Sequence, residues 1–319
     1  TVNLNISVNL TVHTLQVMRL ATTEERIFKM FLVVGIHMVF IYINLAMLFT
    51  LWSKPSFRHT ARYILFAHML FNDTIHLTIT LTLYMLGNFH LFVVRVACAF
   101  MVLLSSCTFV NAPLNLAVMS LERYTAVCFP LRHSELATPR RTQLAVGLVW
   151  ALGVINVLID VCALFLTEPS FFLSPVLCTI EHLQTAGWQQ EKGVGFNAFC
   201  FVAVSLIIIY TYIAIIVTAR SASDKTKASK AHKTVLLHLV QLGLSLSSFL
   251  YTPIESALAS VGSTTIFIDL RYLNFLFLII LPRCLSPLIY GLRDDAVRPL
   301  FLHYLTCRTR KVKAAVMVQ

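Results

Sequence analysis

The chain has 319 residues, of which 58% are hydrophobic and 12% charged, and its mean hydropathy is +0.79. Soluble domains carry roughly 25% charged and 45–50% apolar residues, so this composition excludes an ordinary water-soluble protein. The net charge of +11 is basic enough for a nucleic-acid-binding protein, but the charge distribution described below is better explained by membrane topology. We therefore expect a membrane protein that binds membrane lipid and no nucleic acid.

The first 26 residues are predicted to form an extracellular tail. They contain no continuous apolar segment of the signal-peptide kind, so the first apolar run is expected to direct insertion. Asn5 and Asn9 each begin an Asn-x-Ser/Thr sequon in this tail, which predicts N-glycosylation.

Seven apolar runs follow in chain order. A helix of roughly 20 apolar residues crosses the bilayer core, so each run is a candidate transmembrane helix. The sequence predicts an all-α membrane protein, a seven-transmembrane helix bundle over residues 27–290. The runs lie near 27–52, 62–86, 95–121, 143–166, 195–219, 233–258 and 266–290.

The orientation of the bundle is predicted from the basic residues. One set of connecting segments holds 18 of the 25 Lys and Arg residues against five acids, whereas the opposite face is balanced. Lys and Arg collect on the cytoplasmic side of membrane proteins. The N-terminus is therefore expected outside and the C-terminus inside. The basic segments are 53–61, 122–142, 220–232 and 291–319, and the count includes Arg62 and Lys233 at the starts of the second and sixth runs.

Residues 291–319 are predicted to form a cytoplasmic amphipathic helix and tail. Pro299 fits the first position of such a helix. Its apolar residues, expected to lie on the membrane, are Leu300, Phe301, Tyr304 and Leu305. Cys307 is either palmitoylated or unmodified.

Two of the eight cysteines lie on the predicted outer side, where disulfides persist: Cys98 and Cys178. We expect them to form a disulfide that holds the long outer loop 167–194 on the bundle. The other cysteines lie mostly in apolar runs, where cysteine behaves as a small buried hydrophobe. Nothing in the chain has zinc-ligand spacing, and we expect neither a metal nor a cofactor.

Ionisable residues inside the predicted spans are costly and normally face the bundle interior. Asp73 and Arg283 are expected to pair with each other, although Arg283 could instead bond backbone carbonyls or snorkel. Asp160 and Glu255, in the outer halves of their spans, could contact a ligand or a neighbouring helix. Pro287 should kink the seventh helix, and Pro253 the sixth helix near its outer end.

The motifs Glu122-Arg123-Tyr124 and Ser286-Pro287-Leu288-Ile289-Tyr290, with Cys98 and seven spans, resemble those of rhodopsin-type (class A) G-protein-coupled receptors. Asn44, Asp73 and Trp150 match further landmarks of that family. The resemblance covers about residues 27–307.

Three further stretches of the sequence resemble motifs of the odorant receptors, and most of all those of fish. The stretches concerned are Met119 to Leu131, Lys230 to Leu239 and Pro287 to Arg293. The chain departs from the family where Glu122 and Ser286 replace the usual Asp and Asn, and where Leu246 to Phe249 replace an aromatic signature. Arg283 beside Asp73 puts the family's sodium site in doubt, because the guanidinium could replace the cation.

The resemblance implies a small, mostly apolar odorant bound between the outer halves of the helices. The matching positions are Val102, Ser105, Ser106, Phe109, Phe196, Asn197, Cys200, Phe249, Glu255, Tyr272 and Leu276. Ser105 stands where amine receptors carry an acid, which argues against a biogenic amine.

The resemblance also implies a heterotrimeric G protein of the stimulatory type as partner, with cAMP as the signal, in the plasma or ciliary membrane of sensory neurons. Arg123 would pair with Glu122 at rest and meet the G protein when the sixth helix swings out. The residues of this switch are Glu122, Arg123, Tyr124, Tyr212, Pro287 and Tyr290.

Two alternatives remain at this point. One is a non-olfactory class A receptor for a small molecule. The other is a transporter or channel, against which stand the lack of an internal repeat between the halves and of a ring of pore charges. An enzyme is not expected, because no nucleophile with a base, nor a metal-ligand cluster, appears in the sequence.

Overall fold

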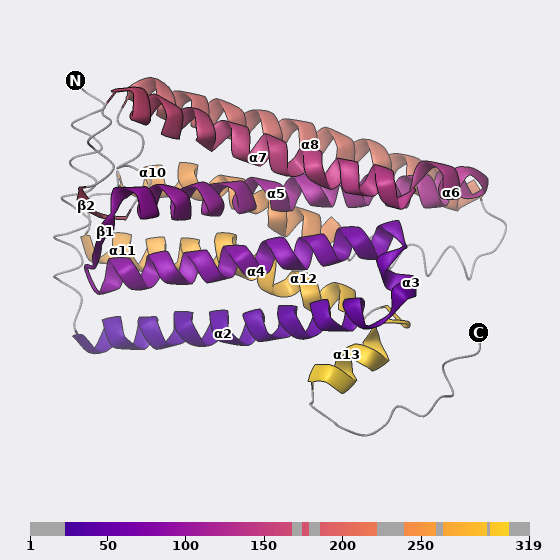
Figure 1. Ribbon diagram of the computed structural model, residues 1–319, viewed down its shortest axis with the longest axis horizontal. Helices are drawn as coiled ribbons and strands as arrows, with labels where there is room; N and C mark the ends of the chain where they lie inside the picture. The colour runs from indigo at the N-terminus through magenta and orange to yellow at the C-terminus, as the bar shows by residue number, and fades with distance from the viewer. Residues whose placement is uncertain are drawn as a thin grey trace.

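The computed structural model of the chain is a bundle of long helices that lie side by side (Figure 1). It describes residues 23–167, 174–178, 186–221, 239–259, 264–291 and 294–305. Within these ranges, six helical segments are long and apolar enough to cross a membrane. Five are continuous: α2 (Thr23–Ser53), α4 (Ala61–Asn88), α5 (Arg95–Cys128), α7 (Pro139–Thr167) and α8 (Gly187–Ser221).

The seventh predicted helix is the sixth of these segments, and it is interrupted. It consists of α11 (Thr264–Asn274), a π-helical turn η5 (Phe275–Ile280) and α12 (Leu281–Gly291). Pro282 is the second residue after the π turn and has no N–H to bond the carbonyl four residues earlier. The regular ladder therefore cannot continue through this point, and a π turn of this kind is frequent at functional sites.

The sixth predicted helix is also broken. Residues 239–247 are helical, and a 3-10 turn, η4 (Ser248–Leu250), joins them to α10 (Tyr251–Ala259). Pro253 lies just beyond the turn and removes one helical N–H there. The predicted run began at residue 233, and residues 233–238 lie outside the described part of the chain.

The two ends of the bundle are built differently (Figure 1). At one end β1 (Phe92–Val94) pairs antiparallel with β2 (Pro175–Leu177), close to the ends of α10 and α11. At the other end lie the short helices α3 (Pro55–Arg58) and α6 (His133–Leu136), the latter preceded by a 3-10 turn, η1 (Pro130–Arg132).

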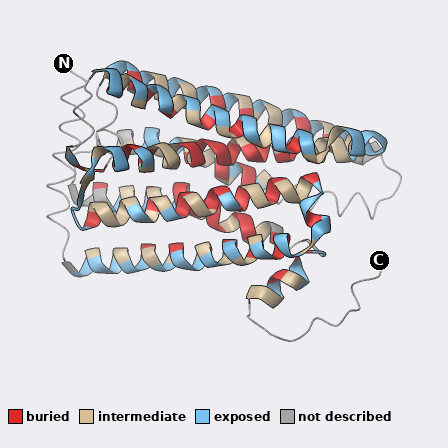
Figure 2. Cartoon of the chain, viewed as in Figure 1, coloured by how far each residue is buried: buried red, intermediate tan, exposed pale blue. Residues whose placement is uncertain are grey.

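Burial separates the inner helices from the outer ones. Buried residues gather along the middle of α4, α5 and α12, whereas α2, α7 and α8 carry more exposed residues and fewer buried ones (Figure 2). Many of those exposed side chains are large and apolar, such as Trp52, Phe199 and Leu206. An apolar surface of this extent is expected of helices whose outer faces contact lipid.

The helix after the bundle differs from the prediction. It forms as α13 (Arg298–Leu305), with Pro299 at its second position. Phe301 was expected on the membrane surface but is fully buried, in the core cluster that also contains Met47 and Leu51 of α2. The reason is close packing: a Cβ on Gly291 would collide with the Met47 side chain, so glycine allows the chain to approach α2 there.

Candidate ligand-binding and signalling site

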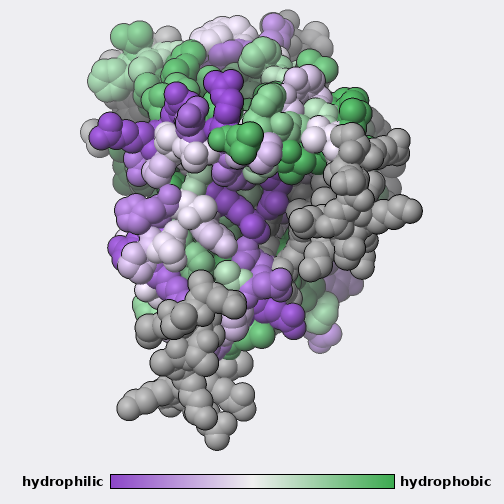
Figure 3. Space-filling view, turned by 90° about the vertical axis from the view of Figure 1, so that its right-hand side faces the viewer, coloured by the Kyte–Doolittle hydropathy of each residue, from purple (hydrophilic) through white to green (hydrophobic). Residues whose placement is uncertain are grey.

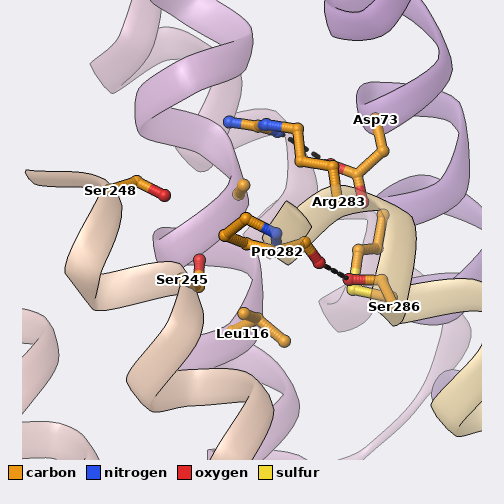
Figure 4. A pocket seen from close by; sticks show the side chains of 9 residues that line it. Asp73, Leu116, Ser245, Ser248, Pro282, Arg283 and Ser286 are labelled. Atoms are coloured by element: carbon orange, nitrogen blue, oxygen red, sulfur yellow. Dashed lines mark hydrogen bonds and ion pairs between the residues drawn. The ribbon is translucent and has the colours of Figure 1, made fainter. Parts of the chain in front are cut away.

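A buried ion pair occupies the middle of the bundle. Arg283 Nη1 in α12 lies 2.8 Å from Asp73 Oδ1 in α4, and the two side chains are 4% and 2% exposed. The pair predicted from the sequence is therefore present (Figure 4). A charge left alone at this depth would be strongly destabilising, so each residue requires the other.

Arg283 also reaches a third helix. Its Nη2 donates to the Phe109 carbonyl of α5 at 3.4 Å, a long hydrogen bond. That carbonyl lacks its usual helical donor, because Pro113 four residues later has no N–H. Arg283 thus connects α4, α5 and α12 at one point.

A small cavity lies beside this ion pair. Its volume is about 10 Å³, which is close to the space that one water molecule needs. Figure 4 shows three serines, Ser245, Ser248 and Ser286, around Pro282 at this place. This cavity is therefore partly hydroxylic and too small for a ligand of odorant size.

The broken sixth helix is attached to the seventh at two points. Gln241 Nε2 donates to Ser286 Oγ at 2.8 Å, and Ser248 Oγ donates to the Leu278 carbonyl at 2.6 Å. Leu278 is the residue whose carbonyl Pro282 deprives of its helical donor. Ser248 supplies the missing hydrogen bond from a different helix.

Two histidines of α4, His68 half-buried and His76 buried, form further connections that sequence reasoning missed. Trp150 Nε1 in α7 donates to His68 Nε2 in α4 at 2.7 Å, and His68 Nδ1 lies 3.1 Å from Asn115 Oδ1 in α5. His76 Nδ1 lies 2.9 Å from Thr108 Oγ1, which joins α4 to α5 again. The only sequence signal was the presence of polar residues inside apolar runs.

The predicted ligand-binding residues fall into several groups. Phe109 and Phe249 meet edge to face with ring centroids 5.7 Å apart, and Phe201 packs against Phe249 at 6.1 Å. Leu276 belongs to the same apolar cluster as Phe109. Phe201 was not predicted, although it lies one residue after Cys200.

The remaining members of the predicted set are more dispersed. Val102 packs under the disulfide in a separate cluster, and the ring of Tyr272 faces Lys29 of α2 at 5.6 Å. Cys200 is buried in α8. Of the other five, Glu255 pairs with Arg271, and four are half-buried on α5 and α8: Ser105, Ser106, Phe196 and Asn197.

Contacts between neighbouring helices hold the end of the bundle that carries β1 and β2. Cys98 and Cys178 form the predicted disulfide, with Cα atoms 5.2 Å apart. Asp160 of α7, left open between ligand and helix contact, pairs with Lys192 of α8 at 2.6 Å. Three other polar contacts complete this end: Glu255 with Arg271, Lys29 with Asp269, and Arg26 with the Asn88 carbonyl.

The opposite end contains the Glu122-Arg123-Tyr124 motif at the close of α5. Glu122 Oε1 lies 3.2 Å from His133 Nε2 in α6, a hydrogen-bonding partner that the sequence did not reveal. The Tyr124 hydroxyl lies 3.4 Å from that of Tyr210 in α8.

The other switch residues are placed as follows. Tyr212 and Pro287 are buried, Tyr212 in the central apolar cluster. Tyr290 belongs to α12, but its side chain is outside the described part of the structure. The predicted sequons at Asn5 and Asn9, most of the basic segment 220–232, and Cys307 also lie outside the described residues.

Viewed along the helices, the end that carries α3 and α6 gathers hydrophilic side chains (Figure 3). Its exposed basic residues include Arg58, Arg132, Arg140 and Arg141. This end therefore combines positive charge with the terminus of α5, on the side of the bundle opposite the disulfide.

Comparisons with known proteins agree with this architecture. The family model described as "7 transmembrane receptor (rhodopsin family)" matches residues 18–290. "Odorant receptor 131-2" of Danio rerio is 35% identical over 293 residues, which is 90% of this chain and 87% of that protein. "Olfactory receptor 2AJ1" of Homo sapiens is 25% identical over 75% of this chain and 74% of its own. "Olfactory receptor 1073" of Rattus norvegicus is 25% identical over 79% and 82%.

Proposed function

The chain belongs to the odorant receptors of the rhodopsin family, a group of seven-transmembrane receptors of the cell membrane, and we propose that it binds a small, mostly apolar odorant and activates a stimulatory G protein. The predicted fold class is thereby confirmed, and members of this family are not enzymes. The specific ligand, the G-protein type and the cAMP response belong to the proposal.

The observation that carries the ligand proposal is the aromatic group formed by Phe109, Phe201 and Phe249. It joins α5, α8 and the break in the sixth helix, between the disulfide end and the buried ion pair. Aromatic rings in edge-to-face contact offer an apolar surface that suits a small hydrophobic molecule. A ligand resting there would touch the point at which the sixth helix is broken.

The proposed orientation rests on two independent features at opposite ends of the bundle. The Cys98–Cys178 disulfide belongs on an oxidising side, and the exposed arginines near α3 and α6 belong on the cytoplasmic side. The terminus of α5 with Arg123 then faces the cytosol, where a G protein could reach it. The outer end would receive the odorant.

An odorant screen in cells that report cAMP tests the proposal. Wild-type receptor should respond to at least one small apolar odorant, and Phe109→Ala should shift that response to higher concentration. Phe100→Ala is the matched control, because Phe100 lies on the same helix α5 but is 62% exposed on its outer face. Ion flux in the absence of G protein would instead indicate a channel and contradict the proposal.

Arg123→Ala separates binding from signalling in the same cells. It should abolish the cAMP response while leaving the receptor at the cell surface, because Arg123 is proposed to contact the G protein. A full response from this variant would contradict that role. If the odorant lowers cAMP in cells with the wild-type receptor, the receptor activates a G protein of another type than the stimulatory one.

A further inference from the structure

The two contacts between the sixth and seventh helices differ in their position relative to the break at Ser248–Leu250. Ser248 lies in the break itself, and its hydroxyl bonds the Leu278 carbonyl. Gln241 lies seven residues earlier, on the segment 239–247 that leads toward the predicted cytoplasmic side, and its amide bonds Ser286. Both bonds attach the sixth helix to the seventh. The Ser248 bond holds the break itself, whereas the Gln241 bond holds the segment on one side of the break.

Helix geometry shows which contact a swing of this segment would break. Seven residues of helix span about 10 Å, so a tilt of about 10° around Ser248 moves Gln241 by about 2 Å. A hydrogen bond of 2.8 Å does not survive such a displacement. Ser248 lies at the pivot and barely moves, so its bond to Leu278 persists.

The burial of Gln241 makes the loss of its hydrogen bond to Ser286 costly. Gln241 is 1% exposed, and its Oε1 has no hydrogen-bond partner among the described residues. Its Nε2 has two: Ser286 Oγ, and more weakly Met69 Sδ at 3.5 Å. Ser286 Oγ in turn donates to the Pro282 carbonyl at 3.0 Å, which orients its lone pair toward the amide.

We propose that the Gln241–Ser286 hydrogen bond is a latch that keeps the cytoplasmic half of the sixth helix closed, and that the Ser248–Leu278 bond is the pivot about which this half turns. This inference rests on the proposed coupling to a G protein. A contact that exists in only one arrangement biases the equilibrium, whereas a contact kept in both does not. The two bonds are chemically alike, yet their loss has different consequences.

Loss of the latch should raise basal signalling. Gln241→Leu and Ser286→Ala each remove one neutral hydrogen bond, which corresponds to a rise of about fivefold in the active fraction. The double variant should show the same rise as either single variant, because both remove one contact. Basal activity is measured as G-protein dissociation without odorant, normalised to receptor at the cell surface.

Loss of the pivot should leave basal signalling unchanged and lower the melting temperature. Ser248→Ala leaves the Leu278 carbonyl without its donor, which should reduce the Tm of purified receptor by about 2–4 °C. Ser248→Thr keeps a hydroxyl and should restore the Tm. Ser247→Ala is the matched control, because Ser247 bonds the Leu244 carbonyl of its own helix and should change neither quantity.

A distance measurement distinguishes failure of this inference from failure of the proposed function. Spin labels on exposed Val240 and Leu144 report opening of the sixth helix without any G protein, in a background lacking Cys128, Cys162 and Cys307. Gln241→Leu should lengthen this distance, and Ser248→Ala should not. Equal lengthening in both variants, or none in Gln241→Leu, overturns the latch. If the distance lengthens in Gln241→Leu but the receptor activates no G protein, the latch is supported and the proposed coupling to a G protein is contradicted.

Discussion

The sixth and seventh helices are held together by contacts of different strength at the two ends of the bundle. At the β1–β2 end they share the Glu255–Arg271 ion pair, and the Cys98–Cys178 disulfide and the Asp160–Lys192 pair fix the neighbouring segments. Toward the α3–α6 end, they share the neutral hydrogen bond between Gln241 and Ser286. A disulfide contributes several kcal/mol, whereas a neutral hydrogen bond contributes about 1 kcal/mol. One end is therefore built to stay fixed and the other to move.

The Asp73–Arg283 pair, between these two regions, should show the largest effect. Arg283→Asp or Asp73→Arg alone places like charges together in the interior, which should cost about 3–5 kcal/mol or more and remove the receptor from the cell surface. The double reversal restores opposite charges and should recover surface expression, measured with an N-terminal epitope. If the double variant does not reach the cell surface, the two residues are required for something other than their direct pairing.

The disulfide should come next. Cys98→Ser should destabilise the receptor by about 2–5 kcal/mol and reduce its amount at the surface. Cys162→Ser is the control, because Cys162 is a free and exposed cysteine. Thermal unfolding of purified receptor measures the difference, and equal Tm values for both variants would show that the disulfide end is not the firmly held one.

The outer ion pair should have a smaller effect on stability and none on basal signalling. Asp160→Asn removes the partner of Lys192 and should lower stability by about 1 kcal/mol, because the lysine is partly exposed. Basal G-protein activity should stay at the wild-type level, since both residues lie at the fixed end. A rise in basal activity would show that this end takes part in switching.

The smallest change is expected at the Glu122–His133 contact. Glu122→Gln should weaken the resting arrangement and raise basal signalling by at most about fivefold, because the pair is near the surface. His133→Ala removes the same partner from the other side and should raise it equally. An unchanged basal level in both variants would make the contact purely structural.

Sequence alone predicted the features that depend on polarity. Charges inside apolar runs are rare and must be paired, so Asp73 and Arg283 could be identified without a structure. The cysteine pair followed from topology in the same way. The partners of Asp160 and Glu255 could not be predicted. Lys192 and Arg271 lie on other helices, and the sequence does not define how those helices are rotated about their axes.

The helix breaks were harder to foresee than the kinks. Pro282 and Pro253 mark carbonyls that lose their donors, and this much can be read from the chain. Which side chain fills the gap depends on the packing of two helices, and most buried serines bond their own helix, as Ser247 does. The burial of Phe301 against α2 was missed for a related reason, since apolar residues on a surface helix fit lipid and protein equally well.

The most direct test of the account compares movement at the two ends in the same receptor. One label pair, Val240 with Leu144, spans the cytoplasmic half of the sixth helix and α7; the other, Ile254 with Leu166, spans their outer halves. The Gln241→Leu variant should lengthen the first distance by several ångströms and leave the second unchanged. Equal changes in both distances, or a change confined to the outer pair, would contradict a bundle with one fixed and one opening end.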